Sequence, residues 1–74
     1  MNYLLAYKDR YGNDFHGTPW LHEIARNTLK SGKIMAKEFA KMYSNVILFA
    51  CTDEELQNEE IITWDFVNKH KIDY

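Results

Sequence analysis

The stretch PWLHEIARNTLKSGKIMAKEFAKMY, Pro19 to Tyr43, decides the expected fold, because its apolar residues recur at helical spacing throughout. At about 100° per residue, one side of such a helix carries Leu21, Ile24, Thr28, Met35, Phe39 and Met42. Thr18 and Pro19 suit a helix start, where a hydroxyl caps free amides and the missing proline N–H costs nothing. The pattern predicts one long amphipathic helix over about 19–43.

Ser31 and Gly32 interrupt this stretch and leave open a division into two helices. The pair weakens a helix by roughly 1 kcal/mol or more relative to alanine. The apolar phase nevertheless resumes in register after Gly32. We therefore favour a single helix with a kink at this pair.

The segments on either side of the stretch complete an α+β pattern. Asn2–Lys8 is rich in Tyr and Leu and predicts a strand, and the turn residues of Asp9–Asp14 follow it. Asp14–Gly17 is expected to form a short return arm. Val46–Cys51 is continuously apolar, which is typical of a strand covered on both faces. A strand–helix–strand crossover would place this strand parallel to Asn2–Lys8.

The second half of the chain predicts three further short elements. Thr52 and Glu55 have the spacing of a capping box and indicate one turn of helix. Glu60–Thr63 is expected to be a short edge strand. Residues 64–70 favour a helix, and a longer strand, Ile61–Val67, is the alternative. The result is a single α+β domain over 1–74, β-(hairpin arm)-α-β-β-α, with the long helix on a short three-stranded sheet.

Composition limits the class of protein. The 74 residues carry a net charge of −2, and Cys51 is the one cysteine, so no internal disulfide can form. A small secreted domain usually carries several cysteines. The longest apolar run is too short to span a bilayer, and no signal peptide is recognisable. We expect a soluble, cytoplasmic protein that does not bind membranes.

The charges are distributed unevenly. Residues 1–43 are net basic and residues 44–74 are net acidic. One face of the expected long helix carries a basic row: Arg26, Lys30, Lys33, Lys37 and Lys41. Such a row is either a solvated surface, a site for an acidic protein surface, or a set of contacts to nucleic-acid phosphates. The acidic residues gather in one segment: Asp53, Glu54, Glu55, Glu59 and Glu60. This segment is either a solubilising loop or a docking surface for a basic partner, including a second copy of the chain.

The aromatic content is high for so small a domain, with two Trp, five Tyr and four Phe. A small core cannot enclose all these rings, so some are expected at the surface, as interface anchors or as a cover for a thin core. The candidate anchors are Tyr11, Trp20 and Trp64. The two tryptophans would otherwise plug the ends of the sheet.

No catalytic or metal-binding motif is present. The histidines lack the four-residue spacing of a helical zinc pair, and no cofactor-binding motif occurs. Asp14, His16 and His22 are close enough in sequence to suggest an acid/base cluster, although these residue types are common in turns and helix starts. We expect no enzyme, no cofactor and no metal.

These observations predict a small non-enzymatic protein-interaction module, an inhibitor or regulator acting through charged and aromatic surfaces. Its partner is an unidentified protein or a second copy in a homodimer. The alternative is a nucleic-acid-binding module that uses the basic row.

Overall fold

The structure, a computed structural model, describes residues 1–74 throughout and contains four strands and three helices. In chain order the elements are β1 (Asn2–Lys8), β2 (Trp20–Glu23), α1 (Leu29–Phe39), β3 (Ser44–Cys51), α2 (Asp53–Asn58), α3 (Trp64–Lys69) and β4 (Lys71–Ile72). The two predicted apolar strands are thus confirmed, the second with its start at Ser44 rather than Val46. The α+β class is also confirmed.

The sheet has the order β2-β1-β3-β4, and every neighbouring pair is antiparallel. The predicted three-stranded sheet and its parallel crossover are therefore wrong. The physical reason is β2, an extra strand that pairs antiparallel with β1. It reverses the direction of the chain once more before α1 returns the chain to the start of β3. As a result β3 runs opposite to β1, with Leu48 directly across from Leu5.

The predicted long helix over 19–43 is wrong because its first part is the edge strand β2. Strand alternation puts Trp20, His22 and Ile24 on one face and Leu21 and Glu23 on the other. The apolar residues of this segment fit the two-residue period of a strand, and they also fit the period of a helix. Pairing with β1 decides between the two, because it satisfies the backbone on that side. The predicted return arm Asp14–Gly17 is likewise replaced by β2.

Within the predicted helix, only Leu29–Phe39 is helical, as α1. Asn27 adopts a left-handed backbone (φ 20°), and the side-chain oxygen of Thr28 accepts a hydrogen bond from the Ser31 N–H at 3.1 Å. This cap starts the helix, which then continues without a break through Ser31 and Gly32. Gly32 faces β3, where a Cβ would stand 3.0 Å from Leu48 Cδ1. The glycine therefore allows a close approach of helix and sheet.

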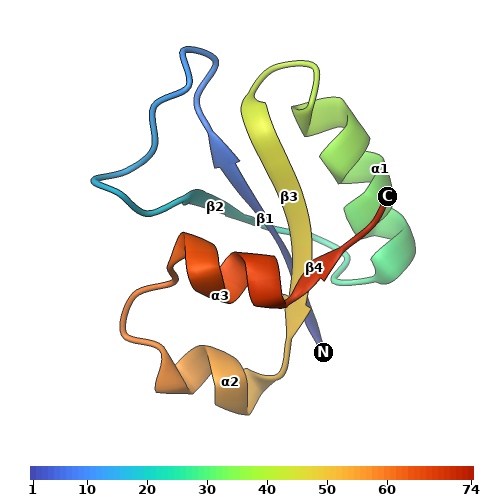
Figure 1. The fold of residues 1–74 in the computed structure, drawn as a ribbon. Coiled ribbons are helices and arrows are strands. Elements are labelled where there is room, and N and C mark those ends of the chain that lie inside the picture. The colour runs from blue at the N-terminus through green and yellow to red at the C-terminus, as the bar shows by residue number, and fades with distance from the viewer.

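The sheet has a helical layer on each face (Figure 1). The face under α1 buries Leu5, Ile24, Ala36, Phe39 and Leu48. The face under α2 and α3 buries Leu4, Ala6, Phe49, Cys51, Phe66 and Val67. None of the three helices has the length and apolarity that a bilayer-spanning helix needs.

The second half of the chain mixes confirmed and corrected predictions. The capping box is present, since Thr52 Oγ1 accepts the Glu55 N–H at 3.1 Å and Glu55 Oε1 accepts the Thr52 N–H at 2.9 Å. Residues 64–69 form α3, so the helical interpretation holds over the strand. The predicted strand Glu60–Thr63 is wrong: these residues connect α2 to α3, because the place beside β3 is taken by β4.

Candidate functional site

The strand β2 is an open edge of the sheet. All four of its side chains are exposed, and it pairs with β1 alone. The Ile24 N–H donates to the Tyr3 carbonyl across this pair at 3.4 Å. Because backbone groups alternate sides along an antiparallel strand, the N–H and C=O groups of Leu21 and Glu23 point away from the sheet. These groups are unpaired and available to another strand.

Apolar side chains surround this open edge. We call the following four residues the β2-edge patch: Phe15 (49% exposed), Trp20 (39%), Leu21 (41%) and Ile61 (63%). The Phe15 and Trp20 ring centroids are 4.9 Å apart. Phe15, Leu21 and Ile61 share a hollow of about 350 Å³ that also includes Pro19. Ile61 is thus brought from a distant part of the sequence beside Phe15 and Leu21, while Trp20 contacts Phe15 from the other face of β2.

A tight turn brings Phe15 to the strand. Phe15 and Thr18 exchange two backbone hydrogen bonds of 2.8 and 3.0 Å, and the two residues between them have positive φ (His16 53°, Gly17 86°). This is the geometry of a type I′ hairpin. The Asp14 carboxylate accepts the Gly17 N–H at 3.1 Å. Phe15 is thus held by a specific turn rather than by a loose loop.

Trp64 connects the same turn to α3. Its indole N–H donates to Asp14 Oδ2 at 3.0 Å, and this hydrogen bond, followed by that of Gly17, lowers the pKa of the Asp14 carboxyl. The Lys8 ammonium lies 5.8 Å from the centre of the indole ring. Trp64 is half-buried in this position and packs against the core under α3. Its position therefore fixes the turn that carries Phe15.

The other two candidate anchors lie apart from each other. Trp20 belongs to the β2-edge patch. Tyr11 is 74% exposed at the tip of the β1–β2 connection, where the Arg10 guanidinium lies over its ring at 5.0 Å and donates to its hydroxyl at 2.9 Å. Tyr11 lines a different hollow together with Met42.

The basic row is divided by the corrected fold. Lys30, Lys33 and Lys37 remain on α1, whereas Arg26 precedes the Thr28 cap and Lys41 follows the helix end. Lys41 also lies 3.5 Å from a carboxylate oxygen of Glu38 on the same surface. The five cations are therefore not carried by one continuous helix face.

The acidic segment is partly occupied by structural contacts. Asp53 accepts a hydrogen bond from the Asn2 side chain at 2.6 Å. Glu55 accepts from the Thr52 backbone, and its Oε2 lies 2.7 Å from His70 Nε2. These contacts, with the backbone hydrogen bond first, lower the pKa of the Glu55 carboxyl. The remaining members, Glu54, Glu59 and Glu60, are exposed.

His70 joins the two helices of this face. Its Nδ1 lies 2.8 Å from the Phe66 carbonyl, and its ring stacks on Phe66 with 4.3 Å between centroids. The hydrogen bond to the Phe66 carbonyl, and then the bond to Glu55, raise the pKa of His70. These contacts give His70 a structural role at the end of α3.

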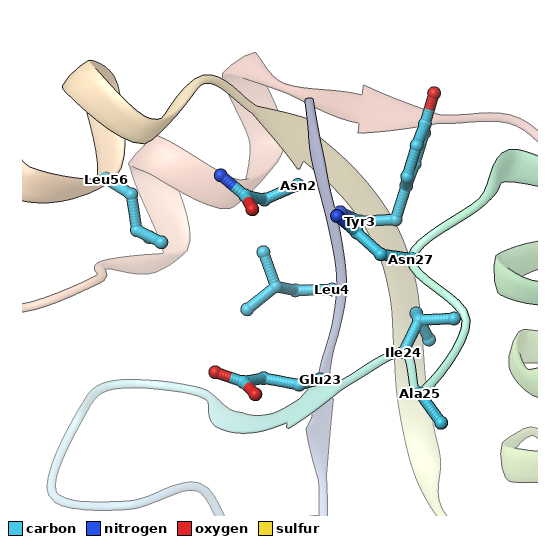
Figure 2. A pocket seen from close by; sticks show the side chains of 8 residues that line it. All are labelled: Asn2, Tyr3, Leu4, Glu23, Ile24, Ala25, Asn27 and Leu56. Carbon is cyan, nitrogen blue, oxygen red and sulfur yellow. The ribbon is translucent and has the colours of Figure 1, made fainter.

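A second hollow, of about 290 Å³, opens where β2 ends and leaves the start of β1 uncovered (Figure 2). Leu4 and Leu56 point into the same side of this region, and the Glu23 carboxylate and the Asn2 amide flank them. The side chain of Asn27 accepts the Tyr3 N–H at 2.7 Å and closes the edge of β1 beyond β2. The hollow thus combines an apolar floor with one carboxylate.

The candidate acid/base residues and the cysteine are each placed in a structural setting. No three His, Cys, Asp or Glu side chains lie in a position to hold a metal ion. Asp14 is engaged by Trp64, His16 occupies the hairpin turn, and His22 packs on Phe39 with 4.8 Å between ring centroids. Burial of the Cys51 thiol raises its pKa, which disfavours the reactive thiolate.

Comparison of the chain with protein-family models, with curated proteins and with solved structures finds no match.

Proposed function

We propose that this chain is a small, non-enzymatic protein-interaction module that binds through the β2-edge patch. The observation that carries the proposal is the coincidence of an unpaired strand edge with four large, exposed apolar side chains. An open edge offers backbone hydrogen bonds, and the neighbouring side chains offer apolar contact area. Both are requirements for adding a partner strand to a sheet.

The patch has the composition of an interface centre. Tryptophan is enriched at binding hot spots, and here the Phe15 ring packs on that of Trp20. Each of the four side chains is about half exposed, so its further burial contributes about 1 kcal/mol. The part of a partner that pairs with this edge would be covered in the complex. By covering that part of the partner's surface, the module would act as an inhibitor or regulator.

A pair of isoleucine variants tests the proposal. Ile61 is 63% exposed in the patch, and Ile34 is 57% exposed on α1, where it lines a separate hollow. We would immobilise wild-type protein, Ile61→Asp and Ile34→Asp, and compare the proteins that each retains from a cell extract. We expect specific partners to bind wild type and Ile34→Asp, and to bind Ile61→Asp at least tenfold more weakly.

Each partner found in this way is then tested in purified form, by calorimetry against the same three proteins. Circular dichroism confirms that the two variants are folded. Equal binding by Ile61→Asp and wild type would contradict the proposed surface. Retention of no protein by any of the three, together with no self-association, would contradict the proposed function.

A further inference from the structure

From the geometry of the open edge we infer that its occupant is a second copy of this chain, bound through antiparallel β2–β2 pairing with the two-fold axis at His22. This inference rests on the proposed function and specifies its partner. The pairing joins two four-stranded sheets into one continuous sheet, with both α1 helices on the same face. The reason for a second copy is that β2 is complementary to itself in one register.

Only Leu21 and Glu23 direct their backbone groups outward, so three symmetric registers are available: those centred on Leu21, His22 or Glu23. The register centred on Leu21 places Glu23 opposite Pro19 of the second copy, and proline has no N–H to donate. The register centred on Glu23 places two carboxylates directly opposite each other, which is destabilising. Both are therefore disfavoured.

The register centred on His22 has neither fault. Leu21 of each copy lies opposite Glu23 of the other, and each of these two pairs forms two N–H···O=C bonds. No like-charged carboxylates oppose one another. On the α1 face Trp20 comes opposite Ile24 of the second copy, whose side chain is already buried in its own core. The apolar members of the patch then flank the joined strands.

A cysteine scan tests this register directly. In the inferred dimer the two His22 positions form a non-hydrogen-bonded pair with Cα atoms about 4.5 Å apart, which a disulfide can bridge. The two Leu21 positions are about 9 Å apart, which is too far. We would incubate His22→Cys and Leu21→Cys in a glutathione redox buffer. Wild type is the control, since its Cys51 is 1% exposed.

We expect a covalent dimer of His22→Cys and at least tenfold less of Leu21→Cys. Equal cross-linking of the two variants would overturn the register. Absence of cross-linking in both would overturn the self-pairing.

A charge pair at Leu21 provides a second test that does not depend on oxidation. Leu21→Lys places an ammonium opposite Glu23 of the second copy at two sites, and Leu21→Glu places a carboxylate there. Both variants lose the same leucine, and the site is 41% exposed, so both should fold. We would measure sedimentation equilibrium from about 10 μM to 1 mM, since a four-residue edge buries less area than a stable dimer interface.

We expect the lysine variant to dimerise at least tenfold more tightly than the glutamate variant. Equal dimerisation of both, or a monomer for wild type and both variants at 1 mM, would overturn the inference. If self-association fails while Ile61→Asp still loses a purified partner that Ile34→Asp retains, then the proposed function stands and only the occupant is wrong. If self-association is absent and Ile61→Asp also binds the purified partner as well as wild type does, the proposed function itself is contradicted.

Discussion

The two faces of the sheet are covered by different means. On the α1 face one helix of 11 residues covers the strands, and the Tyr7 ring is centred 5.3 Å from Phe39 of α1 and 4.6 Å from Tyr43, which follows the helix. On the opposite face two helices of six residues each begin with a threonine cap and are joined by the Glu55–His70 contact. Helices this short are unstable alone. Both faces enclose an apolar cluster, and all three helices begin with a threonine cap. The difference is that the two short helices are also joined to each other by a side-chain contact, whereas α1 packs on the sheet alone.

The largest expected effect comes from removing a core side chain from either face. Leu48 and Phe49 are adjacent on β3, point to opposite faces and are fully buried. We expect Leu48→Ala to lower the free energy of unfolding by about 3 kcal/mol and Phe49→Ala by about 4 kcal/mol. Urea denaturation measures both. A loss below 1 kcal/mol for one of them would show that its face contributes little to the core.

Removal of a helix cap should affect the α2/α3 face and leave the α1 face almost unchanged. Thr52→Ala removes the hydroxyl that accepts the Glu55 N–H and disrupts the capping box. We expect a loss of about 1 kcal/mol in unfolding free energy, with faster hydrogen exchange in α2 and little change in α1. Thr52→Ser, which keeps the hydroxyl, is the matched control. Equal acceleration of exchange in α1 and α2 would contradict the separation.

The hydrogen bond of His70 to the Phe66 carbonyl, and then its contact with Glu55, make the α2/α3 face sensitive to pH. The pKa of His70 is raised above its ordinary 6.5, so its stabilisation is complete below pH 6.5 and is lost as pH rises through the raised value. The pKa of Glu55 is lowered below its ordinary 4.5, so its stabilisation is present above pH 4.5 and is lost as pH falls through the lowered value. The contact is therefore strongest between about pH 4.5 and 6.5.

Thermal unfolding of wild type and His70→Gln across pH 4 to 8 measures this contribution. We expect the difference in Tm between the two proteins to be largest within the window and to shrink above it. The α1 face has no corresponding pair. A difference in Tm that does not vary with pH would mean that the contact does not depend on the charge of His70.

The smallest expected effect is charge reversal on α1. Lys33→Glu combined with Lys37→Glu changes neither the core side chains of α1 nor the β2-edge patch. We expect a change within about 0.5 kcal/mol in stability and no loss of partner binding. Binding to random-sequence DNA or RNA, titrated from about 50 to 200 mM salt, provides the control. Salt-dependent binding that this variant abolishes would instead favour the nucleic-acid alternative.

Local patterns in the sequence predicted part of the fold. The strand Asn2–Lys8, the Thr52–Glu55 capping box and the helix at 64–69 depend on residues close in sequence, and all three are confirmed. The segment 19–43 was mispredicted because its apolar residues fit both a helix and a strand. Pairing with β1, a contact between distant residues, decided the outcome.

The candidate site was predictable only in one residue. Trp20 was expected as a surface anchor on its residue type. Phe15, Leu21 and Ile61 were missed, because they come together only through the β1–β2 turn, the edge strand and the α2–α3 connection. Two features of the sequence could have indicated the strand: the glycine-containing dipeptide His16-Gly17, typical of a tight hairpin, and the alternation that follows Pro19.

The opposite edge of the sheet differs from β2 in being formed by a strand of only two residues, β4. The Tyr74 hydroxyl donates to the Val46 carbonyl at 2.9 Å, on the side of β3 that β4 leaves uncovered. In the language of polymer chemistry, a molecule that pairs through one edge has a valence of one. A unit with two open edges adds copies without limit and forms fibres, whereas a unit with one open edge stops growing at two. In the dimer that we propose, the Tyr74 hydroxyl would occupy one acceptor at the opposite edge and so oppose the addition of a third copy.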